Sequence, residues 1–334
     1  MQYRYLGRSA LRVSPLCIGA MMFGGATDEA TARRIIDKAR DQGVNFIDTA
    51  DGYNGGKSEE VVGRAIREHR HHWILATKFG HRMGSGPNEG GQSRKWIFQD
   101  VEHSLRKLGT DYIDLLYFHK ADVEAPFEEA LRAIRDLQTQ GKVRCYGVSN
   151  FKGWRIAEIC RAADAVGIDR PIASQPLYNM VDRLSEVEQL PAAGHYGLGI
   201  VPYSPLARGV LSGKYAKDAP PPEGSRVARG DERIKQTEWR KESVDIAQAV
   251  AARAASKGLS TVAFAIAWVL KNRFVSAAIA GPRTEEQWDS YLPALDARLG
   301  PEDEAFVDSL VPPGHASTPG YTDPAYPIEG RQVR

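Results

Sequence analysis

The feature that most constrains the fold of this chain is a regular alternation of short apolar runs with longer amphipathic stretches. The apolar runs are nearly continuous in hydrophobicity, which is typical of strands buried on both faces of a parallel sheet. Eight such runs occur, at residues 16–19, 45–48, 74–78, 113–119, 145–149, 172–175, 199–203 and 276–280. Each is too short to form a helix of ordinary length, so we interpret them as strands.

The stretches between these runs have the spacing of amphipathic helices. In the clearest one, Ser93 is placed to cap a helix that buries Ile97, Val101 and Leu105, and Gly109 is placed to end it. Further helices are expected at 30–42, 58–68, 126–141, 152–166, 183–195, 244–256 and 285–297. Eight strands alternating with helices predict a (β/α)₈ barrel, with a doubly wound open sheet as the alternative.

The length of 334 residues fits either two domains or one large barrel. The sequence shows no internal repeat and no low-complexity linker, so we predict one domain over residues 1–334. Three segments lie outside the alternation. Residues 3–13 predict a β-hairpin, residues 216–241 a long surface loop after strand seven, and residues 311–334 an irregular, proline-rich tail.

Composition excludes several classes of function. Lys and Arg number 44 against 42 Asp and Glu, so the net charge of +2 provides no basic field for nucleic acid. The three cysteines, Cys17, Cys145 and Cys160, form no metal or disulfide pattern and favour a reducing compartment. The longest apolar run, 262–270, is far below the ~20 residues of a membrane helix, and residues 1–4 do not resemble a signal peptide. We therefore expect a cytoplasmic protein with no membrane, nucleic-acid or metal partner.

Polar residues follow almost every predicted strand. Asp48, Lys78 and His119 end strands two, three and four, and Tyr53 lies just beyond strand two. The later strands end at Ser149–Asn150, Gln175 and Tyr203, and the loop after strand eight carries Gly281 and Arg283. The carboxyl ends of all strands meet at one face of a (β/α)₈ barrel, where active sites of this fold form. The sequence therefore predicts a site at this face.

The residue types at these strand ends indicate a specific chemistry. A tyrosine titrates near ~10, too high for ready proton transfer at neutral pH, but a neighbouring ammonium lowers that value. A carboxylate would hold the ammonium in place, and an imidazole could orient a carbonyl oxygen. Such a set protonates a carbonyl while hydride arrives from elsewhere. It contains no serine or cysteine nucleophile with a paired base, so hydrolysis is disfavoured.

At these residues the sequence resembles the aldo-keto reductase superfamily, in the branch related to potassium-channel β-subunits and bacterial general-stress reductases. The resemblance runs from about residue 3 to residue 310. It rests on the stretches 45–53, 58–60, 76–80, 111–116, His119, 141–144, 147–151 and 202–206, which agree in order, spacing and residue type.

The resemblance implies a (β/α)₈ barrel that binds NADP(H) without a Rossmann fingerprint. It implies Tyr53 as general acid/base, Lys78 and Asp48 as the pair that tunes it, and His119 as the group that orients the substrate. The implied cofactor contacts are Ser149, Asn150, Gln175 and Tyr203 at the nicotinamide, Ser204, Pro205, Leu206, Arg208, Gly209, Leu211 and Lys214 at the pyrophosphate, and Gly281, Arg283, Thr284 and Gln287 at the adenosine 2′-phosphate. Met22 and Phe23, which follow strand one, are candidates for the wall of the substrate pocket.

We therefore predict an NADP(H)-dependent oxidoreductase that reduces small aldehydes and ketones to alcohols. The family usually places an acidic residue and an asparagine at the adenine, where this chain has Ser290 and Tyr291, so NAD(H) stays open as the cofactor. Two alternative functions also stay open. One is a sugar dehydrogenase that works in the oxidative direction, and the other is a slow, cofactor-sensing subunit of a larger complex. The substrate and the oligomeric state are not set by the sequence.

Overall fold

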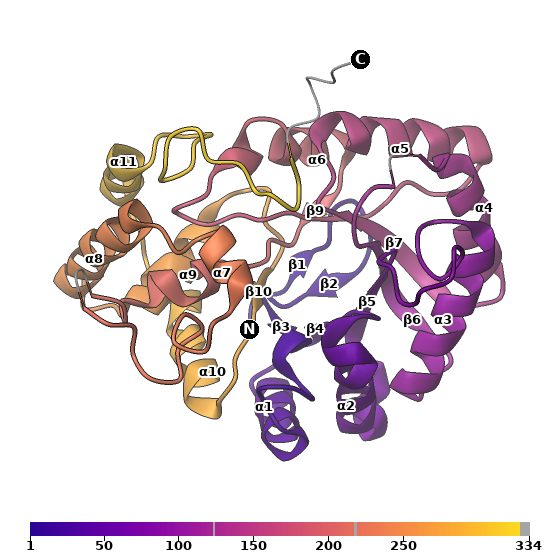
Figure 1. Cartoon of the computed structure of the whole chain (residues 1–334), viewed down its shortest axis with the longest axis horizontal. Helices are drawn as coiled ribbons and strands as arrows, with labels where there is room; N and C mark the ends of the chain where they lie inside the picture. The colour runs from indigo at the N-terminus through magenta and orange to yellow at the C-terminus, as the bar shows by residue number, and fades with distance from the viewer. Residues whose placement is uncertain (123, 217–218, 328–334) are drawn as a thin grey trace. The chain divides into compact units, whose positions relative to one another are not determined.

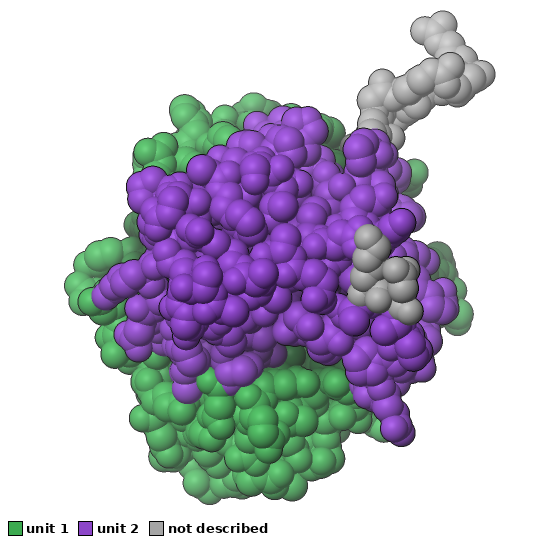
Figure 2. All heavy atoms as spheres, turned by 90° about the vertical axis from the view of Figure 1, so that its left-hand side faces the viewer, with its two compact units in different colours: residues 1–176, 188–203, 273–289 green, residues 177–187, 204–272, 290–334 purple. Residues whose placement is uncertain are grey.

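The computed structural model describes residues 1–122, 124–216 and 219–327. Its backbone contacts divide the chain into two compact units, which Figure 2 shows in different colours. Unit 1 comprises residues 1–176, 188–203 and 273–289, and unit 2 comprises residues 177–187, 204–272 and 290–334. The single-domain organisation stays a prediction.

Unit 1 contains an eight-stranded parallel sheet in the order β10-β3-β4-β5-β6-β7-β8-β9. The strands are β3 (Leu16–Gly19), β4 (Phe46–Asp48), β5 (Ile74–Phe79), β6 (Ile113–Phe118), β7 (Val143–Ser149), β8 (Ala173–Gln175), β9 (Gly199–Ile200) and β10 (Ala278–Ala280). Each lies within two residues of an apolar run of the sequence at its start and within three at its end. The sheet closes on itself, because Ser276 N donates to Ile200 O at 2.8 Å and Ile279 N donates to Pro202 O at 3.0 Å. The α/β barrel predicted from the alternation is therefore observed.

A two-stranded antiparallel sheet precedes the barrel. β1 (Arg4–Tyr5) pairs with β2 (Arg12–Val13), with Arg4 opposite Val13. Leu6 and Val13 are fully buried and join the apolar interior of the barrel.

The helices of unit 1 follow the strands in turn, and Figure 1 shows α1 to α5 on the outside of β3 to β7. They are α1 (Glu29–Asp41), α2 (Lys57–Ile66), α3 (Arg94–Leu108), α4 (Phe127–Thr139), α5 (Gly153–Val166) and α6 (Gln189–Tyr196). The ends of α3 are as predicted: the Ser93 side chain accepts from Trp96 N, and Gly109 adopts φ 59°, which favours glycine. α10 (Glu285–Tyr291) begins in unit 1 and follows β10.

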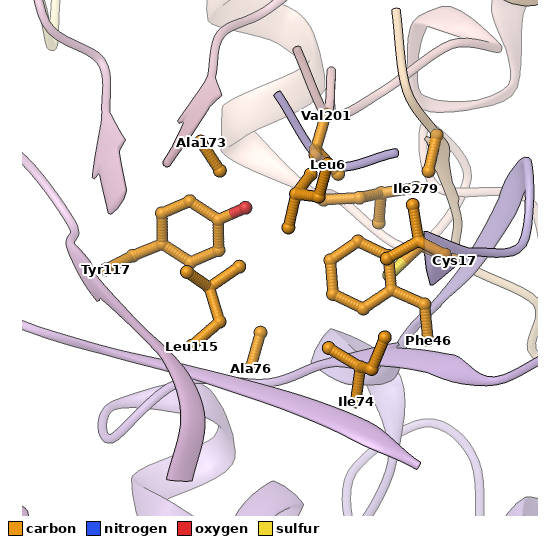
Figure 3. Close-up of a cluster of buried hydrophobic side chains, with 12 residues drawn as sticks. Leu6, Cys17, Phe46, Ile74, Ala76, Leu115, Tyr117, Ala173, Val201 and Ile279 are labelled. Atoms are coloured by element: carbon orange, nitrogen blue, oxygen red, sulfur yellow. The ribbon is translucent and has the colours of Figure 1, made fainter. Parts of the chain in front are cut away.

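The interior of the barrel is filled by inward-pointing side chains from successive strands. Figure 3 shows residues such as Phe46, Leu115 and Ile279 pointing toward one another. The ring of Tyr117 packs directly against Gly147 of the neighbouring strand β7, because a Cβ at Gly147 would lie 2.7 Å from that ring. The interior of the barrel at these residues is therefore a packed apolar core, and the polar side chains gather at the carboxyl ends of the strands.

Unit 2 is mostly helical and differs from the sequence-based expectation in several places. Its helices are α7 (Glu232–Gln236), α8 (Lys241–Ser256), α9 (Thr261–Lys271) and α11 (Pro301–Leu310), with the 3-10 segments η4 (Leu184–Glu186), η5 (Ala207–Ser212) and η6 (Leu292–Leu295). The helix expected at 183–195 is broken into η4 and α6, and the one expected at 285–297 ends at Tyr291.

The segment predicted as a long loop, 216–241, contains α7 and buries Ile234 and Glu238, although residues 217–218 lie outside the described part. The tail predicted to be irregular has no helix or strand after Leu310 in its described part. It is fixed within unit 2 by a bridge between Asp182 and Ala316 and by Ser317 N, which donates to Val181 O at 2.9 Å. Residues 328–334 of that tail lie outside the described residues.

Candidate active site

The centre of the candidate site in unit 1 is the ammonium group of Lys78, whose side chain is fully buried at the end of β5. Its Nζ forms a close ion pair with Asp48 Oδ1 and donates to the carbonyl oxygen of Thr49 at 2.8 Å. A third hydrogen bond reaches the hydroxyl of Tyr53 at 3.1 Å. The register of the sheet brings these groups together, because Asp48 ends β4 beside Ala76 of β5. The structure therefore places three of the four predicted catalytic residues in contact.

Burial and the ion pair act in opposite directions on these groups. Burial opposes a charge on Lys78, but Asp48 and Tyr53 outweigh it and raise the pKa of the ammonium. Burial raises the pKa of Asp48, while Lys78 and Gln175 lower it. Burial also raises the pKa of the Tyr53 hydroxyl above its ordinary value. The effect predicted for the lysine is present, since Lys78 lowers the pKa of Tyr53, but desolvation outweighs it.

His119, the fourth predicted residue, follows β6 and lies beside Tyr53. The two rings meet edge to face, with centroids 5.8 Å apart. Both side chains are partly exposed, whereas Lys78 and Asp48 are buried. Burial, followed by the positive charge of Lys78, holds the pKa of His119 well below its usual range. His119 is therefore a neutral imidazole beside a neutral phenol, and both can be reached from solvent.

A chain of hydrogen bonds joins this group to the residues expected at the nicotinamide. Gln175 Nε2 donates to the second oxygen of Asp48 at 2.9 Å, and the hydroxyl of Ser149 donates to Gln175 O at 2.8 Å. Asn150 Nδ2 donates to His119 O at 2.9 Å, and Tyr203 donates to Asn150 Oδ1 at 2.8 Å. One polar network therefore joins the ends of β4, β5 and β6 to the ends of β7 and β8 and to Tyr203.

The segment expected at the pyrophosphate lies in unit 2 and has an unusual backbone. Ser204, Ala207 and Arg208 are non-glycine residues with φ of 55°, 47° and 52°, and Gly209 follows with φ 98°. Such conformations cost energy in non-glycine residues and cluster at ligand sites. The N–H groups of Ala207 and Gly209 donate to Ser204 O and Leu206 O, both at 2.8 Å, so the left-handed residues form a tight turn held by its own backbone.

Two predicted cations lie on or beside this segment. Arg208 Nε is 3.0 Å from Oε2 of Glu238, which is buried in unit 2. A Cβ built on Gly209 would lie 3.0 Å from Lys214 Nζ, so the lysine ammonium covers that glycine. Pro205 and Leu211 are buried and support the segment, whereas Leu206 is partly exposed.

The remaining predicted residues occupy two loops of unit 1. After β10, Arg283 N donates to Gln287 Oε1 at 2.8 Å, and Gln287 N donates to Thr284 Oγ1 at 3.3 Å, so these residues form one compact turn beyond Gly281. After β3, Met22 is partly exposed and Phe23 is fully buried. Of these two, Met22 is the side chain that a ligand can reach.

Sequence reasoning missed three contributors to this region. The backbone carbonyl of Thr49 accepts from Lys78, and a carbonyl carries no signal in residue type. Thr77, beside Lys78, donates to the buried carboxylate of Glu59 at 2.7 Å. His81 packs against His119 with centroids 4.3 Å apart, and its position three residues after the predicted strand end was the available signal.

Comparison with known proteins identifies the family. The model of the aldo/keto reductase family matches residues 15–312. The chain belongs to the aldo/keto reductase family. It is 39% identical over 304 residues to a protein of Arabidopsis thaliana named "Probable voltage-gated potassium channel subunit beta". The aligned region covers 89% of this chain and 92% of that protein. It is 36% identical over 332 residues to "Uncharacterized oxidoreductase YrpG" of Bacillus subtilis, covering 96% and 98% of the two chains.

These findings confirm the family predicted from the motifs. Aldo/keto reductases are oxidoreductases that act on small carbonyl compounds and generally use a nicotinamide cofactor, so the broad class of reaction is set. A rice protein named "Probable voltage-gated potassium channel subunit beta" is 36% identical over 318 residues, covering 93% of this chain and 97% of the relative. Within the described residues, no helix combines the length and apolar character needed to cross a membrane.

Proposed function

We propose that this aldo/keto reductase reduces small aldehydes and ketones to alcohols with NADP(H), using Tyr53 as the acid. The observation that carries the proposal is the hydrogen-bonded series Asp48–Lys78–Tyr53, which ends at a partly exposed tyrosine.

Tyr53 donates its proton to the carbonyl oxygen as the carbon is reduced. The resulting tyrosinate lies 3.1 Å from the Lys78 ammonium, which stabilises it by a charge-assisted hydrogen bond. Asp48 keeps Lys78 charged and in place, since the two form an ion pair with no exposure to solvent at the lysine. His119 is neutral and directs a ring N–H toward the same carbonyl oxygen. When bound, the reduced nicotinamide supplies the hydride.

The residues of each unit fit the parts of such a cofactor by their chemistry. In unit 1, Asn150, Gln175 and Ser149 offer amide and hydroxyl groups for a carboxamide, and Tyr203 offers an aromatic face. In unit 2, the cations Arg208 and Lys214, which lie on and beside the turn at residues 207–209, suit a phosphate. Arg283 and Thr284 would contact the adenosine 2′-phosphate, because arginine binds phosphate in a fork geometry.

The decisive experiment is Tyr53→Phe in the full chain. We expect the wild type to oxidise NADPH with a panel of aldehydes, followed by the absorbance of the reduced cofactor. The variant loses the proton donor but no charged group, so turnover should fall by about 10³-fold while cofactor binding, measured by calorimetry, is kept. Tyr5→Phe, at an exposed tyrosine of β1, is the matched control and should leave turnover unchanged. Full activity in Tyr53→Phe would overturn the mechanism.

A second candidate function is a slow, cofactor-binding subunit of a larger complex. It is favoured by the relatives named channel subunits beta, which match 89% and 93% of this chain. The two functions differ in rate, because a sensing subunit would hold its cofactor tightly and turn it over very slowly. Multiple-turnover rates with aldehydes, compared with single-turnover rates, separate the reductase from the slow subunit. The same rates, compared with those of alcohol or sugar oxidation, separate both from an oxidative dehydrogenase.

A further inference from the structure

A second imidazole lies beside His119 in unit 1. β5 and β6 end in register, Phe79 beside Phe118, and His119 N donates to Phe79 O at 2.9 Å. At Gly80 the backbone turns with φ 113°, a conformation that L side chains rarely adopt. After this turn the ring of His81 packs edge to face on His119, with centroids 4.3 Å apart and an interplanar angle of 76°. His119 therefore contacts two other rings, those of Tyr53 and His81.

The ring of His119 lacks the usual means of orientation. A functional histidine is ordinarily held by a hydrogen bond at the nitrogen that does not act on the substrate. In His119 the Nδ1 atom is buried and has no hydrogen-bond partner within the described part of the chain. The ring instead makes edge-to-face contacts with two aromatic neighbours, Tyr53 and His81.

The same geometry disfavours the imidazolium form of His119. A protonated ring carries N–H groups at both nitrogens, and the one at Nδ1 would be buried without an acceptor. The charged and titratable groups that act on this ring are Lys78 from β5, His81 from the next loop and Lys120 from the loop after β6, with Tyr53 from the segment after β4. The same two lysines act on His81, and burial and their charges lower the pKa of His81 also.

We propose that His81 is a positioning residue of the reductase, which holds the His119 ring in its working orientation and in its neutral form. The inference rests on the proposed function, in which a neutral His119 directs an N–H toward the carbonyl oxygen. As the pH falls, His81, the less desolvated of the two rings, takes up a proton first. Its charge then opposes protonation of His119, whose ring centroid is 4.3 Å away, so the oxygen-orienting ring stays neutral under more acidic conditions.

The test is the pH dependence of kcat/KM in His81→Phe, which keeps an aromatic ring but cannot be protonated. We expect near wild-type activity at neutral pH and an acid limb shifted upward, with kcat/KM reduced by up to about tenfold relative to wild type on that limb, the limit that a shift of one pKa unit gives. His81→Ala removes the ring, so kcat should fall about tenfold at neutral pH as well. His195→Phe, at an exposed histidine of α6, is the control and should change neither.

A second measurement makes the proposal independent of activity. The ring of His119, observed by NMR in the cofactor-free chain labelled at its histidines, should titrate at higher pH in His81→Phe than in the wild type. In His81→Phe, an unchanged titration of His119, or an equal loss of activity at all pH values, would overturn the proposal. If no aldehyde is reduced, the proposed function fails while the NMR titration still decides whether His81 acts on His119. His81→Gln, polar and uncharged, serves in the same two measurements if His81→Phe does not fold.

Discussion

Two groups of buried charges lie on opposite sides of strand β5, and they are stabilised in opposite ways. The tyrosine cluster, inside the barrel, consists of Asp48, Tyr53, Lys78 and Gln175. The acidic cluster, between the barrel and helices α2 and α3, consists of Asp51, Glu59, Asp100 and Lys107. Successive residues of a strand point to opposite faces, so Lys78 serves the first cluster and Thr77 the second.

The clusters differ in how their charges are compensated. In the tyrosine cluster, both oxygens of Asp48 have partners, and one lysine balances one aspartate. In the acidic cluster, three carboxyl groups face a single lysine, whose Nζ lies 3.8 Å from Glu59, beyond hydrogen-bond distance. The charges of Asp51 and Glu59 both act on Asp100 and favour its protonated form, so the cluster keeps a proton. Burial and the neighbouring carboxylates raise the pKa of Asp51 to about 6 and that of Asp100 to about 9.

This difference indicates that the two clusters have different roles. A compensated ion pair presents a fixed charge to Tyr53, as proton transfer requires. A cluster that shares a proton carries no fixed charge and instead makes stability depend on pH. Both clusters flank the segment from Asp48 to Glu59, which carries Tyr53. Substitutions in one cluster at a time therefore test this difference in role.

The largest effect is expected from Lys78→Met. The substitution leaves Asp48 buried without its cation, which should lower the free energy of unfolding by about 3–5 kcal/mol. It also removes the stabilisation of the Tyr53 anion, so kcat should fall by about 10²–10⁴-fold. Urea unfolding and NADPH-linked turnover measure the two effects.

The double variant Asp48→Asn with Lys78→Met separates stability from chemistry. Removing both charges should recover most of the lost stability, because no buried charge remains unpaired, but it should recover no activity. Stability that stays as low as in the single variant would show that the pair acts through packing and not through charge compensation.

The second prediction concerns the acidic cluster, where the substitution should raise the free energy of unfolding. Asp100 has a raised pKa, so its contribution to stability is fully present below about pH 4 and is lost as the pH rises toward about 9. Asp100→Asn keeps the size of the protonated side chain and cannot ionise. The variant should therefore be more stable than the wild type, by about 2–3 kcal/mol near pH ~8, with the gap closing toward pH ~5.

Thermal unfolding over this pH range measures the gap, and Asp41→Asn, at an exposed aspartate of α1, is the control. A gap that does not change with pH, or a variant that is less stable at alkaline pH, would mean that Asp100 is ionised in the folded chain. Turnover of Asp100→Asn should stay close to wild type, which is the contrast with Lys78→Met.

The two clusters also show what a sequence can and cannot predict. The residues of the tyrosine cluster were predictable because Asp48, Lys78 and Gln175 each end a short apolar run and Tyr53 lies just beyond one. A barrel brings such strand ends to one face. Glu59 was not, because an acidic residue in the first turn of a helix is ordinarily a surface match to the helix dipole. In the structure it is fully buried and bound to Thr77.

The fold shows the same distinction. The barrel strands were predictable from their continuous apolar runs, whereas α9 was not predicted because residues 263–270 are buried on all sides and have no amphipathic period. α11 carries Pro301 at its first position and an acidic first turn, signals that predict a helix start and were available in the sequence. The left-handed residues at 207–208 were not predictable, since neither alanine nor arginine favours that conformation.

The smallest effect is expected where the two clusters meet, at Thr77. Thr77→Val keeps the shape of the side chain and removes its hydrogen bond of 2.7 Å to Glu59, so stability should fall by about 1–2 kcal/mol. Lys78 keeps its bonds to Asp48, Thr49 and Tyr53, and β5 keeps its place in the sheet, so kcat/KM should change less than about twofold. Thr77→Ser, which restores the hydroxyl, should recover stability. A fall in kcat/KM of about tenfold or more in Thr77→Val, without a matching change in cofactor binding, would show that the acidic cluster positions Lys78 through the strand and that the two clusters act as one unit.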